Sequence, residues 1–524
     1  MEPLAGKGQP SGWRMSRRRR QGAFLLVVGG LAILGAMLVG SSDPDGPRIA
    51  IDRGPNVVFV LADDQPDSTF RASMMPRTFA SLDRAVNFTG SIAAPPLCCP
   101  YRAGVLSGQY PQNHGVEMSR PGYASLREKA LVLPEFLREA GYETAFVGKY
   151  LNGTTSAIGT SPAPGWDRWV SFASEPSYEN PELSIDGSAR RYGGHRTSEV
   201  LTRAAIRFVD RARGNGQPFF LWLAHYAPHP ARGSEGSCGS KHNAPALPAD
   251  YDFATRFRFP RGPNWNHPPT GKPPWLREIA QRLDRTGRRE MVSRWRCSLG
   301  AAQEVDRSIA TLTRRLVHNG QMANTLFVVG SDNGTNFGEH RLERKKGVYE
   351  EKLQVPLMLQ APRGRGYGST VGGERGVLVS QVDLTATILD IAGAAPCVDG
   401  SCRRLDGRSL VELLRSPANP GWTADRAVPI KTGSCWIRAF RTPSITFINS
   451  ESDARKNDAE ACTWPPSGFA ELYRLDRDPD QLENLASTMP AAELDGFRAR
   501  LDSLQRCSGI AGREPEMADR PFCE

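Results

Sequence analysis

Two pairs of polar residues in the sequence have the types and spacing for chemistry on a charged substrate. Asp63 and Asp64 end the apolar run NVVFVLADD, and Asp332 and Asn333 belong to the end of the run TLFVVGSDNG. Carboxylate and carboxamide oxygens are ligands that Ca²⁺ or Mg²⁺ accepts, so the two pairs could converge on one hard divalent cation. Each pair alone is also a common turn former. Their occurrence on two similar runs favours the metal interpretation.

A third cluster is the hexapeptide LCCPYR at residues 97–102. Adjacent cysteines could form a vicinal disulfide, remain structural thiols or bind a soft metal. None of these explains Pro100 and Arg102, and no Cys or His lies at the spacing that a zinc site needs. A functional interpretation makes Cys98 a covalent nucleophile, with Arg102 stabilising negative charge beside it.

The elements that must position these residues are predicted from apolar patterns. Continuous apolar runs ending in polar residues predict buried strands at residues 56–64, 142–150, 218–229 and 325–334. Helical spacing extends from Leu133 to Ala140, where Gly141 is a stop, and over 201–209 after a cap at Thr197 or Ser198. Strands alternating with helices predict an α/β layered domain with a mostly parallel sheet, whose ligands bind beyond the carboxyl ends of the strands.

Two regions depart from this alternating pattern. Residues 232–290 are rich in Gly, Pro, Asn and Trp without sustained periodicity, which indicates a long insertion that either shapes a substrate pocket or is a decorative loop. Beyond residue 397, the stretches CWIRAFR, SITFINS and ELYRLDRD predict a small antiparallel sheet. We therefore expect a catalytic domain over 55–396, a C-terminal α+β subdomain over 397–490, and a C-terminal helix and tail over 491–524, with the helix from Ala491 to Leu504.

The N-terminal segment, residues 1–42, is interpreted as a targeting signal. Its RRRR run precedes GAFLLVVGGLAILGAMLVG, which is typical of a cleaved signal peptide or an uncleaved anchor. The segment carries half of the formal net charge of +10, so the rest of the chain has a mild basic bias that does not indicate nucleic-acid binding. We expect an exported protein, secreted, periplasmic or on the cell surface, that meets a membrane only through this segment.

The cysteine count agrees with export to an oxidising compartment. Apart from Cys98 and Cys99, the cysteines are even in number. Pairing sequential neighbours predicts the bridges Cys238–Cys297, Cys397–Cys402, Cys435–Cys462 and Cys507–Cys523, although sequence alone does not determine connectivity. Cys99 is then expected to be a buried free thiol.

Taken together, the motifs resemble those of the sulfatase family. CCPYR matches the Cys-x-Pro-x-Arg signature, whose first cysteine is oxidised after translation to formylglycine, and RAGVLSGQYPQNHGV resembles its continuation. NVVFVLADD, GYETAFVGKYLNG, APHP, SDNG, KKGVYEEKLQVPLM and ELYRLDRDPDQLENLA are similar to other family segments, in the family's order. The resemblance covers residues 55 to 487. It implies an alkaline-phosphatase-like fold with a large sheet between helices, and the doubled cysteine with GKYLN resembles the glucosamine-6-sulfatase branch.

The resemblance also implies roles for single residues. Cys98 would become formylglycine through a maturation enzyme, and the hydrated aldehyde would attack sulfur with one hydroxyl and release sulfate with the other. The implied ligands of one divalent cation, calcium in most members, are Asp63, Asp64, Asp332, Asn333 and the hydroxyl at residue 98, which comes from Cys98. The implied catalytic residues are Arg102, which steadies residue 98, Lys149, which bridges residue 98 and the sulfate, His229, which protonates the leaving alcohol, and Lys345, which binds a sulfate oxygen.

Some positions depart from the family pattern or have weaker support. Leu151 stands where many sulfatases have a histidine, and Lys346 replaces Lys345 if the register slips by one. A catalytic role is less favoured for His225, while His114 and His340 lie close to motif residues and could line the pocket. No chemical role is expected for the remaining histidines, His195, His242, His267 and His318.

The resemblance therefore predicts a sulfuric ester hydrolase. Its substrate would be a sulfated sugar, a glycosaminoglycan fragment or an aryl sulfate. A phosphomonoester or phosphonate hydrolase of the same superfamily is the first alternative, because a hydrated aldehyde with a cation would also serve phosphoryl transfer. An inactive relative that binds sulfated glycans, with Cys98 left as a thiol, is the second.

Overall fold

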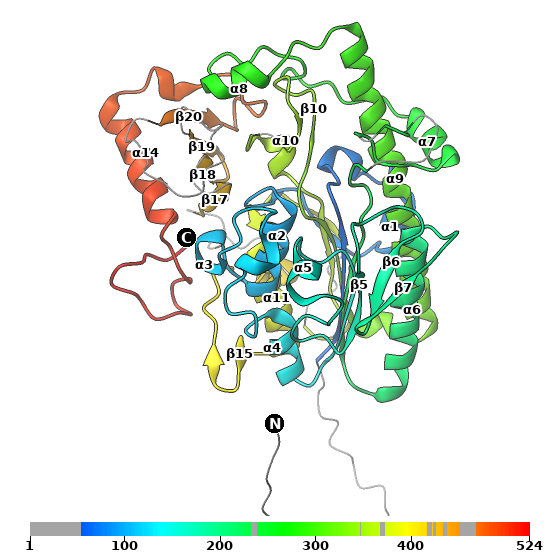
Figure 1. Ribbon diagram of the computed structural model, residues 1–524. Coiled ribbons are helices and arrows are strands. Elements are labelled where there is room, and N and C mark those ends of the chain that lie inside the picture. The colour runs from blue at the N-terminus through cyan, green and yellow to red at the C-terminus, as the bar shows by residue number, and fades with distance from the viewer. Residues whose placement is uncertain are drawn as a thin grey trace, which may run out of the picture. The chain divides into compact units, whose positions relative to one another are not determined.

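The predicted strands lie in the centre of a ten-stranded mixed sheet in the computed structural model (Figure 1). The structure describes residues 54–523 except 232–237, 241, 346, 367–371, 417–421, 423–425, 433–436 and 451–467. In sheet order the strands are β13 (Gly373–Arg375), β2 (Val86–Phe88), β12 (Leu357–Gln360), β9 (Thr325–Ser331), β1 (Asn56–Ala62), β8 (Phe219–Ala224), β4 (Glu143–Gly148), β5 (Arg168–Phe172), β6 (Glu182–Ile185) and β7 (Ser188–Arg191). The central run from β9 to β5 is parallel, which confirms the predicted mostly parallel sheet.

Helices cover both faces of this sheet because its central strands are apolar on both sides. Along β1, Val57 and Phe59 pack with α2 (Cys98–Ser107), α4 (Leu133–Glu139) and α11 (Gln381–Ala392). The alternate residues Val58 and Val60 pack with α6 (Thr197–Asn215) and α9 (Arg285–His318). Successive side chains of a strand point to opposite faces, so a continuous apolar run produces two cores. This is the layered α/β architecture that the sequence predicts (Figure 1).

The shorter helices occur mainly in the loops that connect these layers. They are α1 (Pro76–Ser81), α3 (Pro111–His114), α5 (Thr154–Ile158), α7 (Pro248–Thr255), α8 (Pro274–Ile279), α10 (Glu350–Leu353) and α12 (Val411–Arg415). The 3₁₀ turns are η1 (Asp67–Thr69), η2 (Gly122–Ser125), η3 (Met322–Asn324) and η4 (Leu485–Ser487). Three two-stranded sheets pair β10 (Asn336–Phe337) with β11 (Glu343–Arg344), β14 (Val379–Ser380) with β3 (Ser91–Ile92), and β15 (Cys397–Val398) with β16 (Ser401–Cys402).

A four-stranded antiparallel sheet follows in the C-terminal part of the chain. It consists of β17 (Val428–Thr432), β18 (Ile437–Arg441), β19 (Ile445–Ser450) and β20 (Phe469–Arg474), as the short alternating stretches predict. The predicted terminal helix is α14 (Ala491–Leu504). Phe440, Phe447 and Phe497 stack between the sheet and this helix, so the helix is held by an aromatic core.

One local prediction needs correction. The helix α6 begins at Thr197, but its N-cap is Arg196, and the hydroxyl of Thr197 donates to the carbonyl of Ser177 in place of capping. The predicted insertion 232–290 contains α7, α8 and the first residues of α9. Pro248 and Pro274 begin α7 and α8, and helices of one or two turns are too short to show a period in the sequence.

The disulfide predictions are confirmed where the structure describes both cysteines. The bridges are Cys238–Cys297, Cys397–Cys402 and Cys507–Cys523, whereas the predicted Cys435–Cys462 bridge lies outside the described residues. Cys98 and Cys99 are both buried and free. The predicted targeting segment also lies outside the described residues. Among the residues that the structure describes, no helix is long and apolar enough to cross a membrane.

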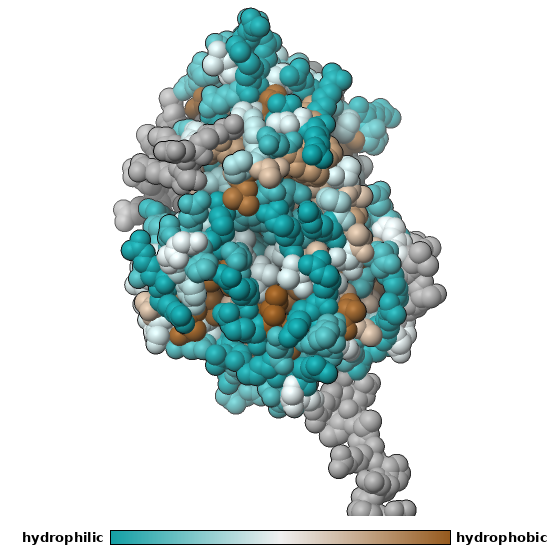
Figure 2. Space-filling view, turned by 90° about the vertical axis from the view of Figure 1, so that its right-hand side faces the viewer, coloured by the Kyte–Doolittle hydropathy of each residue, from teal (hydrophilic) through white to brown (hydrophobic). Residues whose placement is uncertain are grey.

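The face seen in Figure 2 is mainly hydrophilic, with hydrophobic residues scattered singly or in small groups. Among the described residues, the large hydrophobic side chains that are exposed are Leu247, Ile279 and Val317. Single exposed hydrophobic residues are normal on the surface of a folded domain.

Candidate active site

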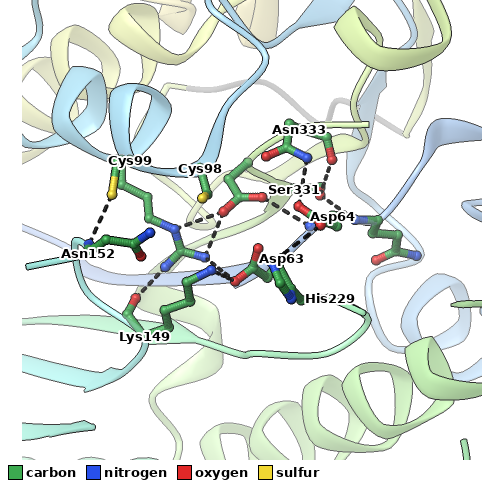
Figure 3. A network of polar contacts seen from close by, with 12 residues as sticks. Asp63, Asp64, Cys98, Cys99, Lys149, Asn152, His229, Ser331 and Asn333 are labelled. Atoms are coloured by element: carbon green, nitrogen blue, oxygen red, sulfur yellow. Dashed lines mark hydrogen bonds and ion pairs between the residues drawn. The ribbon is translucent and has the colours of Figure 1, made fainter. Parts of the chain in front are cut away.

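The residues predicted for the site meet at the carboxyl ends of β1, β4, β8 and β9 (Figure 3). Asp63 and Asp64 follow β1, and Asp332 and Asn333 follow its parallel neighbour β9. The two pairs contact each other directly, because the amide N–H of Asp64 donates to Oδ1 of Asp332 at 3.1 Å and Nδ2 of Asn333 donates to Oδ1 of Asp64 at 2.7 Å. Asp64 has a φ of 66°, in the left-handed region that only the surrounding contacts make tolerable.

Cys98 and Arg102 enter the site from the start of α2. Cys98 is the first residue of the helix, and Pro100 falls in the first turn, where a missing N–H costs nothing. Arg102 lies one turn later, so both side chains leave the same face of the helix. The spacing of the Cys-x-Pro-x-Arg signature is thus the spacing of one helical turn, and it brings the sulfur and the guanidinium together.

Lys149 follows β4 and reaches the site because β4 runs close beside β8. Gly148 has a φ of 124°, and a Cβ there would overlap the carbonyl oxygen of Ala224 on β8, so the position requires glycine. The Lys149 ammonium pairs with Oδ2 of Asp63, and its backbone carbonyl accepts from Arg102. Its Nζ also lies 5.5 Å from the ring centroid of Tyr226.

Each of the remaining positive side chains pairs with a carboxylate of the cluster. Arg102 is 1% exposed, and its Nε donates to Oδ2 of Asp332 at 2.8 Å. Nζ of Lys345 lies 2.6 Å from Oδ1 of Asp64 and 3.8 Å from Sγ of Cys98. The structure therefore brings the predicted Lys345 to the site, and the fallback Lys346 lies outside the described residues.

His229 enters from the loop after β8. Its Nδ1 lies 2.7 Å from the carbonyl oxygen of Pro230, which can only accept, so Nδ1 carries the hydrogen and Nε2 faces Asp64, with 3.7 Å between Nε2 and Oδ2. The imidazole stacks on Tyr226 with ring centroids 4.9 Å apart. Burial lowers the pKa of His229, and the Asp64 carboxylate opposes that shift.

The electrostatics of the cluster follow from burial and close charges. Burial disfavours ionisation of Asp63, but Lys149, His229, Arg102 and Lys345 outweigh it and hold the pKa of Asp63 below its usual value. Burial, together with the Asp63 carboxylate, raises the pKa of Asp332 to about 8, although Arg102 opposes the shift. Each of the three carboxylates has at least one positive side chain as its partner in the cluster.

The chemistry of the oxygens fits a hard divalent cation. Oδ1 of Asp63 and Oδ1 of Asn333 are buried and accept no hydrogen bond from any described residue, and burying such acceptors is costly unless something binds them. Oxygens of Asp63 and Asp332 and the sulfur of Cys98 lie within 4.8 Å of one another. A second group of the same size joins Asp63 and Asp64 to a ring nitrogen of His229. Oxygen ligands of this type are what Ca²⁺ or Mg²⁺ prefers.

The environment of residue 98 favours negative charge. The neighbouring Cys99 thiol lowers the pKa of Cys98 well below its usual value, and Lys149 and Lys345 add to that shift while burial opposes it. The sulfur stands where an oxygen of an oxidised residue 98 would project. Cys99 points away from the cluster, because its sulfur accepts the amide N–H of Asn152 at 2.9 Å (Figure 3).

Two residues that the sequence interpretation does not single out also belong to the site. The hydroxyl of Ser119 lies 3.6 Å from Sγ of Cys98. Tyr226 supports both Lys149 and His229. Tyr226 stands three residues before His229 in the segment after β8, which is a weak local signal of a role in the site. Nothing in the sequence near Ser119 indicates such a role.

The weaker histidine candidates lie outside the cluster. His225 points to the other face of the sheet, where Nε2 lies 2.9 Å from the hydroxyl of Ser308 on α9. His114 accepts the amide N–H of Val116 at 3.0 Å and has a structural role. The buried ring of His340 packs on Tyr349, with ring centroids 4.7 Å apart. His242 comes closer than expected, because it lines a small cavity together with Asp64.

Comparison with known sequences identifies the family of the chain. The family model for Sulfatase matches residues 55–394. N-acetylglucosamine-6-sulfatase of Homo sapiens is 30% identical over 535 residues, covering 95% of this chain and 90% of that protein. The protein of the same name from Capra hircus is 30% identical, covering 89% and 86%.

Solved structures show the same fold at lower identity. A structure described as BT4656 in complex with its substrate D-glucosamine-2-N,6-O-disulfate has a TM-score of 0.68 at 20% identity, covering 86% of this chain and 98% of that one. Phosphonate monoester hydrolase of Agrobacterium radiobacter has a TM-score of 0.60 at 19% identity, covering 86% and 95%. The fold alone thus does not separate the two reactions, but the extended sequence similarity is to sulfatases and does not favour the phosphonate alternative. The chain belongs to the sulfatase family and is a sulfuric ester hydrolase.

Proposed function

We propose that this sulfatase cleaves a 6-O-sulfate ester of a glucosamine-containing sugar, using a formylglycine made from Cys98 and one divalent cation, Ca²⁺. The observation that carries the proposal is the position of Cys98 at the start of α2. Its sulfur lies between the Lys345 ammonium at 3.8 Å and carboxylate oxygens of Asp63 and Asp332 within 4.8 Å. The named relatives, at 30% identity over most of the chain, support the sugar class.

The cation and the modified residue supply chemistry that no ordinary side chain offers. A cation held by Asp63, Asp64, Asp332, Asn333 and the oxygen at residue 98 would neutralise sulfate oxygens. A formylglycine would supply a hydrated aldehyde, with one hydroxyl as the nucleophile and the other for release of sulfate. Cys98 is 3% exposed, so its conversion must precede folding, which supports a maturation enzyme that acts on the unfolded chain.

The side chains of the site have separable tasks in this proposal. Arg102 pairs with the Asp332 carboxylate and keeps residue 98 and Asp332 in fixed positions relative to each other. Lys149 and Lys345 flank residue 98 and bind the oxygens of the sulfate group, whose negative charge they offset. As the imidazolium, His229 passes its Nε2 proton to the oxygen of the leaving alcohol, while the Nδ1 proton stays on the ring and donates to the carbonyl of Pro230.

Export is also part of the proposal. Three described disulfides form readily in an oxidising compartment and are rare in the cytosol. Together with the targeting composition of residues 1–42, they support secretion, a periplasmic location or attachment at the cell surface.

The test compares Cys98→Ala with Cys99→Ala, the adjacent free thiol. We expect Cys98→Ala to lower turnover of N-acetylglucosamine 6-sulfate by at least about 10³-fold, because the nucleophile is lost. Cys99→Ala keeps most of the turnover, and mass spectrometry of the wild-type peptide finds the aldehyde at residue 98. A thiol at residue 98 in fully active protein would refute the formylglycine mechanism.

A further inference from the structure

A cavity of about 780 Å³ opens beside the catalytic side chains. Lys149 and His229 line one part of it, and residues of the segments 150–157 and 171–176, which include parts of α5 and β5, form much of its wall. Its volume lies within the range of sites that enclose small organic ligands. The cavity is therefore the space into which the alcohol part of a bound sulfate ester extends.

The wall of this cavity suits a hydroxylated ring because most of its side chains are small or polar. These residues are Gly153, Thr154, Thr155, Ser156, Ala157, Ser171 and Ser174. Two charged residues stand out from them, Arg120 and Glu175, and both are exposed. Neither forms a hydrogen bond or an ion pair with any residue that the structure describes.

Arg120 differs from the cations around Cys98 because it has no carboxylate partner among the described residues. Lys149 pairs with Asp63, Arg102 with Asp332, and Lys345 with Asp64. These paired cations serve the sulfate that is cleaved. A further cation without a carboxylate adds repulsion to the site unless a ligand supplies the missing negative charge.

The chain also holds Arg120 close to the reaction. The preceding residue, Ser119, lies with its hydroxyl 3.6 Å from Sγ of Cys98. The Arg120 side chain therefore begins one residue after a residue that contacts Cys98, and it lines the cavity beside the site. Its length allows the guanidinium to reach a substituent on the sugar ring that bears the ester or on the next ring.

We propose that Arg120 is a specificity-determining residue that binds a second anionic group of the substrate. That group is a sulfamate, a sulfate or a carboxylate on the sugar that occupies the cavity. The planar guanidinium can donate two parallel hydrogen bonds to such a group, which is the geometry that an ammonium lacks. The inference rests on the proposed sugar substrate and adds a preference for sugars that carry more than one negative charge.

The test uses two sugars with the same 6-O-sulfate, glucosamine N,6-disulfate and N-acetylglucosamine 6-sulfate. The measured quantity is the ratio of their kcat/KM values, disulfate over N-acetyl. We expect Arg120→Gln to lower this ratio about 10-fold, mainly through KM of the disulfate, because one charge-assisted contact is lost. Arg120→Lys restores the charge without the fork and recovers only part of the ratio.

Two matched variants separate recognition from general electrostatics. Arg191→Gln removes an exposed arginine on β7 outside the cavity and leaves the ratio within twofold. Glu175→Gln removes the opposite charge from the cavity wall, so it raises the ratio. If the kcat/KM ratio falls in both of these variants, the effect of Arg120→Gln is not recognition of the second anion.

Calorimetric titration of the disulfate into Cys98→Ala protein supplies a readout that does not depend on turnover. In that background we expect Arg120→Gln to weaken Kd about 10-fold. If both sugars are cleaved and the ratio and Kd stay within twofold of the parent protein, the inference on Arg120 is wrong while the proposed function stands. If neither sugar is cleaved but an aryl sulfate is, the proposed sugar substrate fails and the inference fails with it.

Discussion

Replacement of Asn333 by alanine tests the metal site most directly. The Asn333 amide donates to Oδ1 of Asp64 at 2.7 Å and to the carbonyl of Gly334 at 2.9 Å, and its own Oδ1 is buried without a partner among the described residues. The change removes one charge-assisted hydrogen bond, one neutral hydrogen bond and the free acceptor. Loss of the two hydrogen bonds costs about 2–4 kcal/mol of folding free energy.

Asn113 provides a control whose amide nitrogen has the same bonding pattern. Its Nδ2 donates to Oδ2 of Asp406 at 2.7 Å and to the carbonyl of Cys507 at 2.9 Å, and its Oδ1 accepts from Arg520. Asn113→Ala therefore loses the same two kinds of hydrogen bond and one further bond to Arg520. In chelator it is expected to lose at least as much stability as Asn333→Ala, measured by denaturant unfolding.

Only the Asn333 variant is expected to change the response to Ca²⁺. Loss of a metal-contacting oxygen weakens Kd by at least about 10-fold, the lower end of the effect of removing a supporting residue. At a Ca²⁺ concentration of about 100 times the wild-type Kd, the stabilisation by the ion falls from about 2.7 to about 1.4 kcal/mol. Calorimetric titration of chelator-treated protein measures Kd itself. Equal Ca²⁺ affinity in Asn333→Ala and Asn113→Ala would refute the assignment of Asn333 as a ligand.

Three other variants test separate parts of the structure. Burial lowers the pKa of His225 to about 4, so between pH 6.5 and pH 4 the unfolded chain binds more protons than the fold, which loses up to about 3 kcal/mol of stability on acidification. His225→Gln should remove this loss, measured by unfolding at pH 7 and pH 4.5, and an unchanged pH dependence of stability would contradict the reasoning. The Cys238–Cys297 bridge closes a loop of sequence separation 59, so replacing both cysteines by serine should lower the free energy of unfolding in denaturant by about 4 kcal/mol. A loss below about 1 kcal/mol would show that the bridge does not constrain the unfolded chain. Ser119→Ala should lower kcat about 10-fold with little change in KM, because its hydroxyl contacts residue 98; steady-state kinetics in which only KM changes would place Ser119 in substrate binding.

Much of the architecture follows from local patterns in the chain. The apolar runs before Asp63 and Asp332 are strands because a parallel sheet covered on both faces needs continuous hydrophobic residues. The spacing of Cys98 and Arg102 equals one helical turn, so their proximity is also encoded locally. The short helices α7 and α8 were not predictable in this way, since one or two turns contain too few apolar residues to define a period.

The convergence of the site was predictable only in part. The polar ends of parallel strands were expected to meet, and they do so because β9 and β1 are neighbours in the sheet. Which lysine reaches Cys98, and which side of the sheet His225 faces, depends on loop paths and on the alternation of side chains along β8 and the loop after it. Tertiary packing decides both, because a shift of one residue would reverse the face on which a side chain lies.

The sequence by itself determined the family and the order of the elements, and it predicts the residues that we propose carry the chemistry, because all of these are written in contiguous motifs and short periods. Only the tertiary structure decided the partners of those residues. Ser119 meets Cys98, Tyr226 supports Lys149, and Arg120 faces the cavity without a partner among the described residues. The physical reason is that such contacts join segments far apart in the chain, and their geometry exists only after the strands have paired and the helices have packed on them.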